Sequence, residues 1–194
     1  MFIKKIHKQE VNELPLIGYE GNIEVIEKPS ELRAAVKEIR THPALGFDTE
    51  TKPVFRKGVF NSVALMQVAI PENVFLFRLN KIGFPLTLRS LFEGPKLKKV
   101  GISIRDDLKD LQKLAQYKPR EIIELNRVAK GLGVQNEGAR NLTAIFLGFR
   151  ISKSQQTTNW ERDELTEQQL RYAATDAWVC LEIYQKLLYQ GYIE

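Results

Sequence analysis

The chain has 194 residues, of which 43% are hydrophobic and 27% charged, and its formal net charge is +5. This length suits one domain with a substantial core, and the composition excludes a largely disordered chain. The mild positive charge is compatible with a polyanionic partner but does not identify one. Cys180 is the only cysteine, which excludes an intramolecular disulfide and a cysteine-based zinc cluster.

No run of residues approaches the roughly 18 consecutive apolar residues of a membrane helix. No apolar stretch follows the basic start MFIKKIHKQE either. We therefore expect a protein without membrane contact in a reducing, cytoplasmic setting. Because no repeat or linker marks a boundary, we divide the chain only into an irregular N-terminal arm, residues 1–21, and one domain, residues 22–194.

In chain order, the first two thirds are predicted to alternate strands and helices. Apolar residues at helical spacing follow Pro29-Ser30, which predicts a helix with Ser30 as its N-cap. Pro71-Glu72 separates two β-rich runs, which predicts a hairpin. The expected strands cover 22–27, 44–50, 63–70, 73–80, 99–104 and 121–125. The further helices expected in this part cover 86–92, 106–117 and 127–131.

The last third of the chain is predicted to be mostly helical. A short helix at 142–147 and a polar loop at 155–159 precede a long helix that begins at Thr166, with Gln169 as its capping-box partner. The alternation of strands and helices before it favours a mixed sheet with helices packed on its faces.

Two acids share one face of the expected strand at 44–50. Side chains alternate along a strand, so Asp48 and Glu50 point to one side and Phe47 to the other. Two such carboxylates, about 7 Å apart, repel one another unless a cation lies between them, and Mg²⁺ and Mn²⁺ favour oxygen ligands. From this segment alone, two solvated acids at a strand end are the better interpretation.

The last helix places a third acid among apolar residues. Asp176 falls on a mostly apolar stripe with Tyr172, Val179 and Ile183. A buried carboxylate requires a cation, a metal or a set of donors, so a structural salt bridge and a metal site both remain open. The hydroxyl of Tyr172, one turn earlier, can bind a water near whatever Asp176 binds.

A further pair of acids, Asp106 and Asp107, stands where a strand passes into a helix. Acids in this position commonly favour the first helical turn. On the helical wheel, Asp107 lies near the apolar face with Leu111 and Leu114, whereas Asp106 and Asp110 face water. We therefore expect Asp107 to turn toward the first two acids and Asp106 to cap the helix.

Taken together, these motifs resemble those of a known enzyme family. Asp48-x-Glu50, Gly101-x5-Asp107 and Tyr172-x3-Asp176 resemble the three motifs of DEDD-superfamily 3′–5′ exonucleases, in the tyrosine-bearing subclass. More specifically, the chain resembles the exonuclease domain of Werner-type and ribonuclease D-type proteins, over roughly residues 22–190. The supporting segments are GFDTE at 46–50, VALMQV at 63–68, KKVGI at 98–102, NW at 159–160 and YAATDA at 172–177.

The resemblance implies an α/β fold of the ribonuclease H-like type, with a mixed five- or six-stranded sheet and helices on both faces. It implies two divalent metal ions, Mg²⁺ or Mn²⁺, bound among Asp48, Glu50, Asp107 and Asp176 about 3.5–4 Å apart. One ion would activate the attacking water and the other would stabilise the leaving 3′ oxygen. Tyr172 would orient that water.

Substrate contacts are expected from polar residues near these motifs, since phosphate neutralisation drives nucleic-acid affinity. A solvated loop is an equal alternative for the three basic residues that follow the first motif. Trp160 can stack on a base, but a core position is the preferred interpretation. The expected substrate-binding residues are Thr49, Lys52, Arg56, Lys57 and Lys153.

The chain departs from the family pattern at 162–165, where RDEL replaces the Arg-Pro-Leu that often follows the Trp. This puts substrate affinity, rather than the chemistry, in doubt. The leading hypothesis is an exonuclease acting on the 3′ end of DNA or RNA, with DNA slightly favoured. The alternative is a catalytically weak or inactive nucleic-acid-binding module on the same fold. A small-molecule phosphodiesterase is a third hypothesis, disfavoured by the basic charge. No protein partner follows from the sequence.

Overall fold

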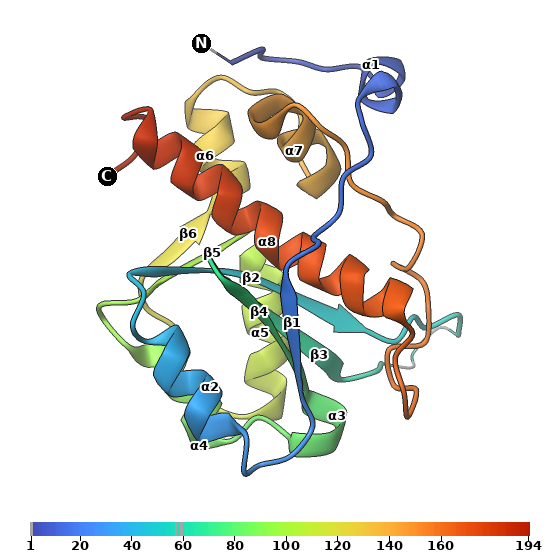
Figure 1. Cartoon of the computed structure of the whole chain (residues 1–194), viewed down its shortest axis with the longest axis vertical. Coiled ribbons are helices and arrows are strands. Elements are labelled where there is room, and N and C mark those ends of the chain that lie inside the picture. Colours follow the sequence, from blue (N-terminus) through green and yellow to red (C-terminus); the bar gives the residue numbers. More distant parts are fainter. Residues whose placement is uncertain (1, 57, 59) are drawn as a thin grey trace.

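The computed structural model describes residues 2–56, 58 and 60–194, which fold around one mixed six-stranded sheet (Figure 1). The strand order is β1-β4-β3-β2-β5-β6. Strand β3 runs antiparallel to both of its neighbours, whereas the remaining pairs are parallel. The strands are β1 (Asn22–Ile26), β2 (Ala44–Thr51), β3 (Val63–Ile70), β4 (Asn73–Arg78), β5 (Lys98–Gly101) and β6 (Ile122–Glu124).

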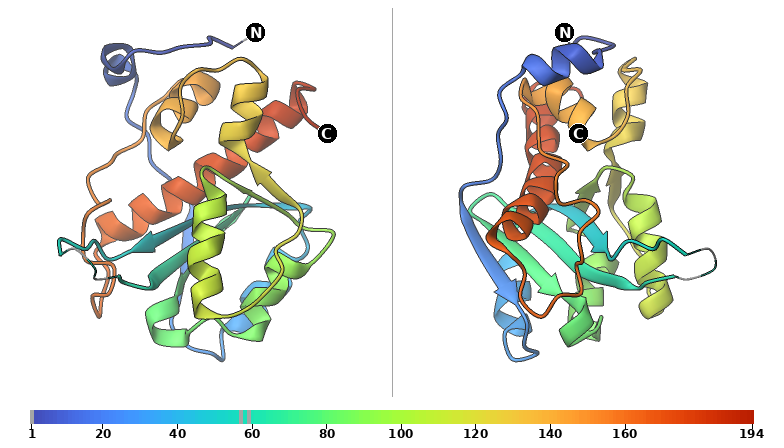
Figure 2. Two further views of the ribbon diagram at one scale, coloured as in Figure 1. Left: turned by 180° about the vertical axis from the view of Figure 1, so that it is seen from behind. Right: turned by 90° about the vertical axis from the view of Figure 1, so that its right-hand side faces the viewer.

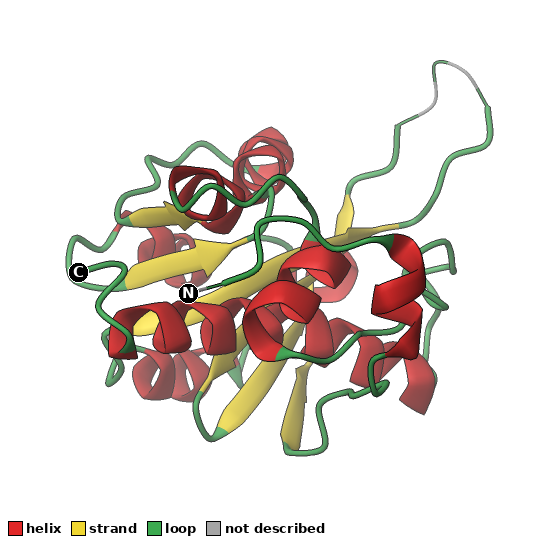
Figure 3. Cartoon of the chain, turned by 90° about the horizontal axis from the view of Figure 1, so that it is seen from above, coloured by secondary structure: helices red, strands yellow, loops and turns green. Residues whose placement is uncertain are grey.

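Helices cover both faces of this sheet (Figures 2 and 3). Two separate apolar cores show the arrangement, because each contains strand residues together with one set of helices. The first set is α1 (Lys8–Glu13), α6 (Leu125–Gly131), α7 (Ala139–Leu147) and α8 (Glu167–Tyr189). The second set is α2 (Leu32–Ile39), α3 (Leu79–Ile82), α4 (Leu86–Glu93) and α5 (Ile104–Leu114). The predicted mixed sheet with helices on both faces is confirmed.

Helix α8 lies unusually close to strand β2, and Gly46 makes this possible. A Cβ atom at Gly46 would stand 2.1 Å from the carbonyl oxygen of Ala177, a distance that real side chains do not reach. With hydrogen in that place, the helix backbone packs directly on the strand. The predicted capping box between Thr166 and Gln169 is present and begins this helix where expected.

Several boundaries differ from the sequence prediction. The N-terminal arm is not wholly irregular, because it contains α1, whose start is a capping box between His7 and Glu10. The predicted Ser30 cap is wrong, since Glu31 occupies the N-cap position of α2. Strand β5 ends at Gly101 and α5 begins at Ile104, two residues before the predicted start. The reason is Ser103, whose φ of 61° ends the strand in a left-handed turn.

Candidate active site

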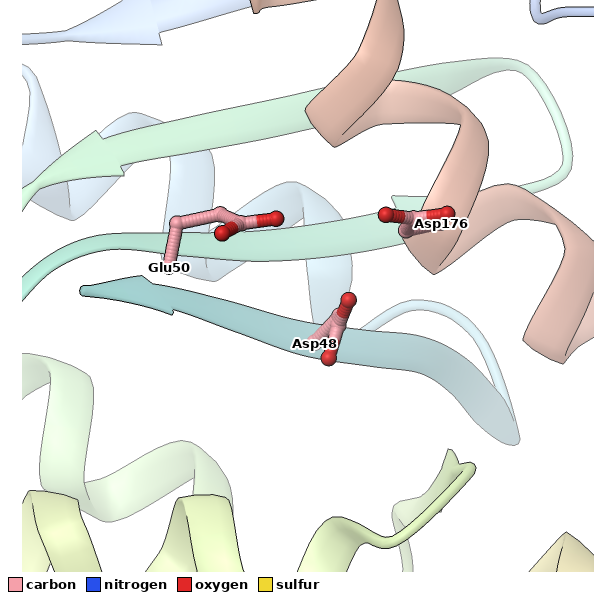
Figure 4. A group of neighbouring side chains, drawn as sticks. All are labelled: Asp48, Glu50 and Asp176. Atoms are coloured by element: carbon pink, nitrogen blue, oxygen red, sulfur yellow. The ribbon is translucent and has the colours of Figure 1, made fainter. Parts of the chain in front are cut away.

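The two acids of strand β2 lie beneath helix α8 (Figure 4). Asp48 and Glu50 alternate with Phe47 along the strand, so they occupy the same face as Gly46, on which α8 packs. Asp48 is partly buried and Glu50 is 8% exposed. The predicted shared face is therefore present, and it points into the protein rather than into solvent.

Helix α8 brings Asp176 to these two acids. Asp176 is buried, with 7% of the residue exposed, and one oxygen from each of Asp48, Glu50 and Asp176 lies within 4.8 Å of the other two. Figure 4 shows the three side chains converging from the strand and the helix. The close packing at Gly46 is what makes this distance possible, because a wider separation of α8 from β2 would carry Asp176 away.

Burial raises the pKa of every acid in the cluster, and repulsion by neighbouring acids adds to the rise for Asp48 and Glu50. Burial is the largest cause for Asp48, whose pKa lies well above its ordinary value, and the neighbouring acids add to the rise. The same causes raise the pKa of Glu50 to about 9. Burial raises the pKa of Asp176 to about 7, although the Tyr172 hydroxyl and the Lys153 ammonium oppose this rise. Together, these acids are poorly stabilised as anions by the protein alone.

The donor set fits a divalent cation. Carboxylate oxygens are the ligands that Mg²⁺ and Mn²⁺ prefer, and three of them meet here without an Arg or Lys ion pair within the described residues. A bound cation would relieve the repulsion that raises their pKa values. The structural salt bridge left open for Asp176 is thus absent from the described part of the chain.

Asp107 approaches the cluster from the opposite face of the sheet. It lies in the first turn of α5, and its carboxylate is the largest charged contributor to the raised pKa of Asp48. Burial raises its own pKa to about 6. It is not among the three acids whose oxygens lie within 4.8 Å of one another. Asp107 therefore borders the cluster from a separate element.

The neighbours of Asp107 face water, as the helical wheel predicted. The Asp106 side chain is 78% exposed and pairs with Lys109, and Asp110 is 49% exposed and pairs with Lys113. The predicted capping role of Asp106 is wrong, because α5 begins two residues earlier and its N-cap position is occupied by Ser103.

Tyr172 stands beside Asp176, one turn earlier on α8. Burial is the main cause that raises the pKa of its hydroxyl above the ordinary value, with the surrounding carboxylates adding to the rise. The hydroxyl is therefore protonated over the whole physiological range. Its ring centre lies 6.0 Å from that of Trp160, which is fully buried. The core interpretation of Trp160 is confirmed.

The residues predicted to contact substrate lie in different surroundings. Thr49 donates a hydrogen bond to Asp107 at 2.5 Å. The ammonium of Lys52 is paired with Glu161 at 3.1 Å. Arg56 and Lys153 are exposed, and Lys153 is close enough to Asp176 to lower its pKa. Lys57 lies outside the described residues.

Two features of the site were missed from the sequence. Gln67 is directly opposite Asp48 on β3 and fully buried, and neither end of its amide has a hydrogen-bond partner among the described residues. A single amide within the apolar run VALMQVAI was the available signal. Glu124 accepts hydrogen bonds from the backbone of Ser103 and Asn126, which braces the turn before α5. No motif pointed to that contact.

Comparisons with known proteins agree with this arrangement. The 3′–5′ exonuclease family matches residues 23–191, and the chain belongs to this family. It is 32% identical over 184 residues to the mouse "Bifunctional 3'-5' exonuclease/ATP-dependent helicase WRN", covering 90% of this chain and 13% of that protein. The predicted membership of the DEDD exonucleases is thereby confirmed.

Two solved structures share the fold. The Nibbler EXO domain of Aedes aegypti superposes with a TM-score of 0.78 at 24% identity, covering 91% of this chain and 93% of that one. Escherichia coli RNase D, described as an exoribonuclease involved in structured RNA processing, gives 0.77 at 25% identity, covering 87% and 45%. The chain thus spans only part of the length of several relatives. Within the described residues, no helix combines the length and apolar character needed to span a bilayer.

Proposed function

We propose that this chain is a metal-dependent 3′–5′ exonuclease that hydrolyses the terminal phosphodiester bond of a nucleic acid. The observation that supports this most strongly is the convergence of Asp48, Glu50 and Asp176 within the family fold. Two divalent ions held by these acids and Asp107 would supply an activated water and would stabilise charge on the leaving 3′ oxygen.

Tyr172 is proposed to orient the attacking water. Its hydroxyl stands beside Asp176, and its raised pKa keeps the proton on the oxygen, so it acts as a hydrogen-bond donor or acceptor rather than as a base. All four acids and the tyrosine are present, which favours catalysis over a purely binding role. Removal of the Tyr172 hydroxyl should slow the chemical step without preventing metal binding.

The substrate strand is proposed to pass near Lys153 and Arg56. Both side chains are exposed, and the positive charge of Lys153 acts electrostatically on Asp176, which supports a role in attracting the reacting phosphate. Lys52 is a weaker candidate because Glu161 already neutralises it. These contacts are independent of base identity and suit an enzyme that trims many sequences.

DNA is proposed as the preferred substrate over RNA. The segments around the first two motifs resemble Werner-type domains, and the sequence identity to the mouse WRN protein is 32%, compared with 26% to E. coli ribonuclease D. We also propose a cytoplasmic location, which the single free cysteine, Cys180, is consistent with.

The test uses 5′-labelled single-stranded DNA and RNA, and DNA with a recessed 3′ end, incubated with Mg²⁺, Mn²⁺ or EDTA. We expect a ladder of products shortened from the 3′ end, faster on DNA, which disappears in EDTA. The matched pair Asp48→Asn and Asp106→Asn removes one charge inside the cluster or one outside it. Only Asp48→Asn should be inactive, and equal activity of the two variants would contradict the assigned site. If the wild-type protein binds nucleic acid but cleaves none of the substrates, the chain is a binding module instead.

A further inference from the structure

A pocket of about 350 Å³ adjoins the acid cluster and is not explained by it. Ser152 and Ser154 line the pocket, whereas the positive charge of Lys153, which lies between them in the sequence, lowers the pKa of Asp176. Tyr172 also lines it. The pocket and the acid cluster therefore share the tyrosine that is proposed to orient the water.

The pocket is formed by three segments that hydrogen bonds hold together. The backbone N–H of Ile17 donates to the carbonyl of Arg150 at 3.0 Å, and that of Arg150 donates to Pro15 at 2.9 Å. The N–H of Tyr19 donates to Thr175 on α8 at 2.9 Å. Figure 1 shows the arm that precedes β1 crossing α8, with the segment after α7 descending beside the same helix. The arm is thus a fixed wall of the pocket.

The lining suits an uncharged, flat group with polar edges. Apolar atoms make up most of the wall surface, while the two serines and Gln168 offer hydrogen-bonding groups. The one cation among the lining residues, Arg171, already pairs with Glu167 at 3.0 Å, and Glu20 adds an exposed, negatively charged residue to the lining. There is no excess positive charge for a phosphate. The apolar wall residues are Leu16, Ile17, Tyr19 and Tyr172.

We infer that this pocket receives a nucleobase of the substrate strand, from a nucleotide upstream of the scissile bond. The inference rests on the proposed function and names a subsite for it. A volume of about 350 Å³ lies at the lower end of small-molecule pockets, roughly 300–1,000 Å³. Aromatic walls favour bases of any sequence, because every base has a stacking face. Residues 16–20 precede the residues 23–191 that match the family model, so this wall of the pocket lies outside the matched segment.

The experiment compares Leu16→Asp with Leu86→Asp. Leu16 lines the pocket and is 56% exposed, and Leu86 is 65% exposed at the start of α4, on the other face of the sheet. Both variants receive the same charge at an exposed leucine, so both should fold. Leu16→Ala removes the wall without adding charge and should give a smaller loss in the same direction.

Three substrates locate the effect. The p-nitrophenyl ester of thymidine 5′-monophosphate has no upstream nucleotide, so all variants should hydrolyse it at the wild-type rate. On single-stranded DNA of eight nucleotides, Leu16→Asp should raise KM about tenfold, within the range that stacking on one base provides. A third set of substrates carries one abasic site, which lacks a base, at successive positions from the 3′ end. For the wild type, KM should rise when the missing base is the one that the pocket receives. This rise in KM should disappear in Leu16→Asp, because that variant no longer binds the base.

Binding of the same DNA in EDTA, followed by fluorescence anisotropy, does not depend on cleavage. Weaker binding by Leu16→Asp than by Leu86→Asp supports the inference. Equal affinity and equal KM for wild type, Leu16→Asp and Leu86→Asp would overturn it, as would an equal loss on the ester and on the DNA. If the wild type binds through the pocket but cleaves nothing, the subsite stands and the proposed function fails.

Discussion

Helices α8 and α5 each present one acid to strand β2, but they do so from opposite faces of the sheet and with different support. Asp176 lies in the middle of a 23-residue helix that packs directly on Gly46. Asp107 lies in the first turn of an 11-residue helix that follows a left-handed residue, and its carboxylate is held by Thr49. One acid is positioned by backbone packing and the other by a side-chain hydrogen bond.

This difference divides the candidate site into two parts. The inner part consists of Asp48, Glu50 and Asp176, which lie in contact range of one cation. The outer part is Asp107, which stands beside Asp48 but outside that group. We expect the inner part to bind a metal ion without assistance, and the outer part to be required for a second ion and for full turnover.

The largest effect is expected from Asp48→Asn, because Asp48 borders both parts. Cleavage of single-stranded DNA should become undetectable, since neither ion retains its shared ligand. The melting temperature of the metal-free protein should rise, because one of several repelling, buried acids has become neutral. Calorimetry in EDTA and a cleavage assay in Mn²⁺ measure both effects. Near-normal turnover would exclude the metal site described here.

The second effect is a loss of stability of the metal-free protein as pH rises. Glu50 has a pKa of about 9 and Asp176 of about 7 when folded, both above their ordinary values. The folded state thus binds more protons than the unfolded state above about pH 4, so unfolding becomes easier as pH increases. Lys99, whose burial lowers its pKa to about 8, acts in the opposite sense only above that pH.

Melting temperatures in EDTA between pH 5 and pH 8 test this expectation. The decline should be shallower in Asp48→Asn, which weakens the repulsion, and excess Mn²⁺ should abolish it because the bound ion stabilises the deprotonated acids. A melting temperature that stays flat or rises over this interval in EDTA would show that the acids are already neutralised by the protein.

Much of this arrangement followed from the sequence, for physical reasons that differ between elements. Strand alternation placed Asp48 and Glu50 on one face, and helical periodicity separated Asp107 from its exposed neighbours. The Thr166 capping box marked the start of α8 correctly. These rules depend only on residues close together in the sequence, so the sequence alone was sufficient to predict these features.

Contacts between distant segments did not follow from the sequence. The bond between Thr49 and Asp107 joins residues 58 positions apart, and the brace from Glu124 to Ser103 spans 21. The start of α5 was misplaced because a left-handed serine is uncommon and carries no sequence signal. Likewise, the arm was expected to be irregular, and its bonds to Arg150 and Thr175 became visible only in three dimensions.

A smaller effect than that of Asp48→Asn is expected from Asp107→Ala. The inner acids should still bind one ion, so calorimetric titration with Mn²⁺ should show one site where the wild type shows two. Turnover should fall at least about 10²-fold, as happens when one group that stabilises transition-state charge is removed. Asp110→Ala is the matched control, because Asp110 is exposed and paired with Lys113. Loss of turnover in Asp110→Ala together with normal turnover in Asp107→Ala would show that Asp110, and not Asp107, is the metal ligand.

Tyr172→Phe should slow single-turnover cleavage by about 10²-fold, at the lower end of the range for positioned proton-handling groups. The phenyl ring keeps the contact with Trp160, whose ring centre is 6.0 Å away, so the fold and metal titration should be unchanged. Unchanged single-turnover rates would show that Tyr172 only packs against its neighbours.

The smallest effect should come from Thr49→Val, which removes the hydroxyl that holds Asp107 and keeps the shape of the side chain. If Thr49 positions Asp107, binding of the second Mn²⁺ ion should weaken about tenfold, within the roughly 10–100-fold range of groups that orient a metal ligand. KM for DNA should stay unchanged, and Thr49→Ser should restore binding because it retains the donor. If Thr49 contacts the substrate instead, KM should rise while Mn²⁺ affinity stays constant. Because Thr49 donates to Asp107 at 2.5 Å from the face of β2 opposite to Glu50, we expect the first result, which would make the outer part of the site dependent on one hydrogen bond.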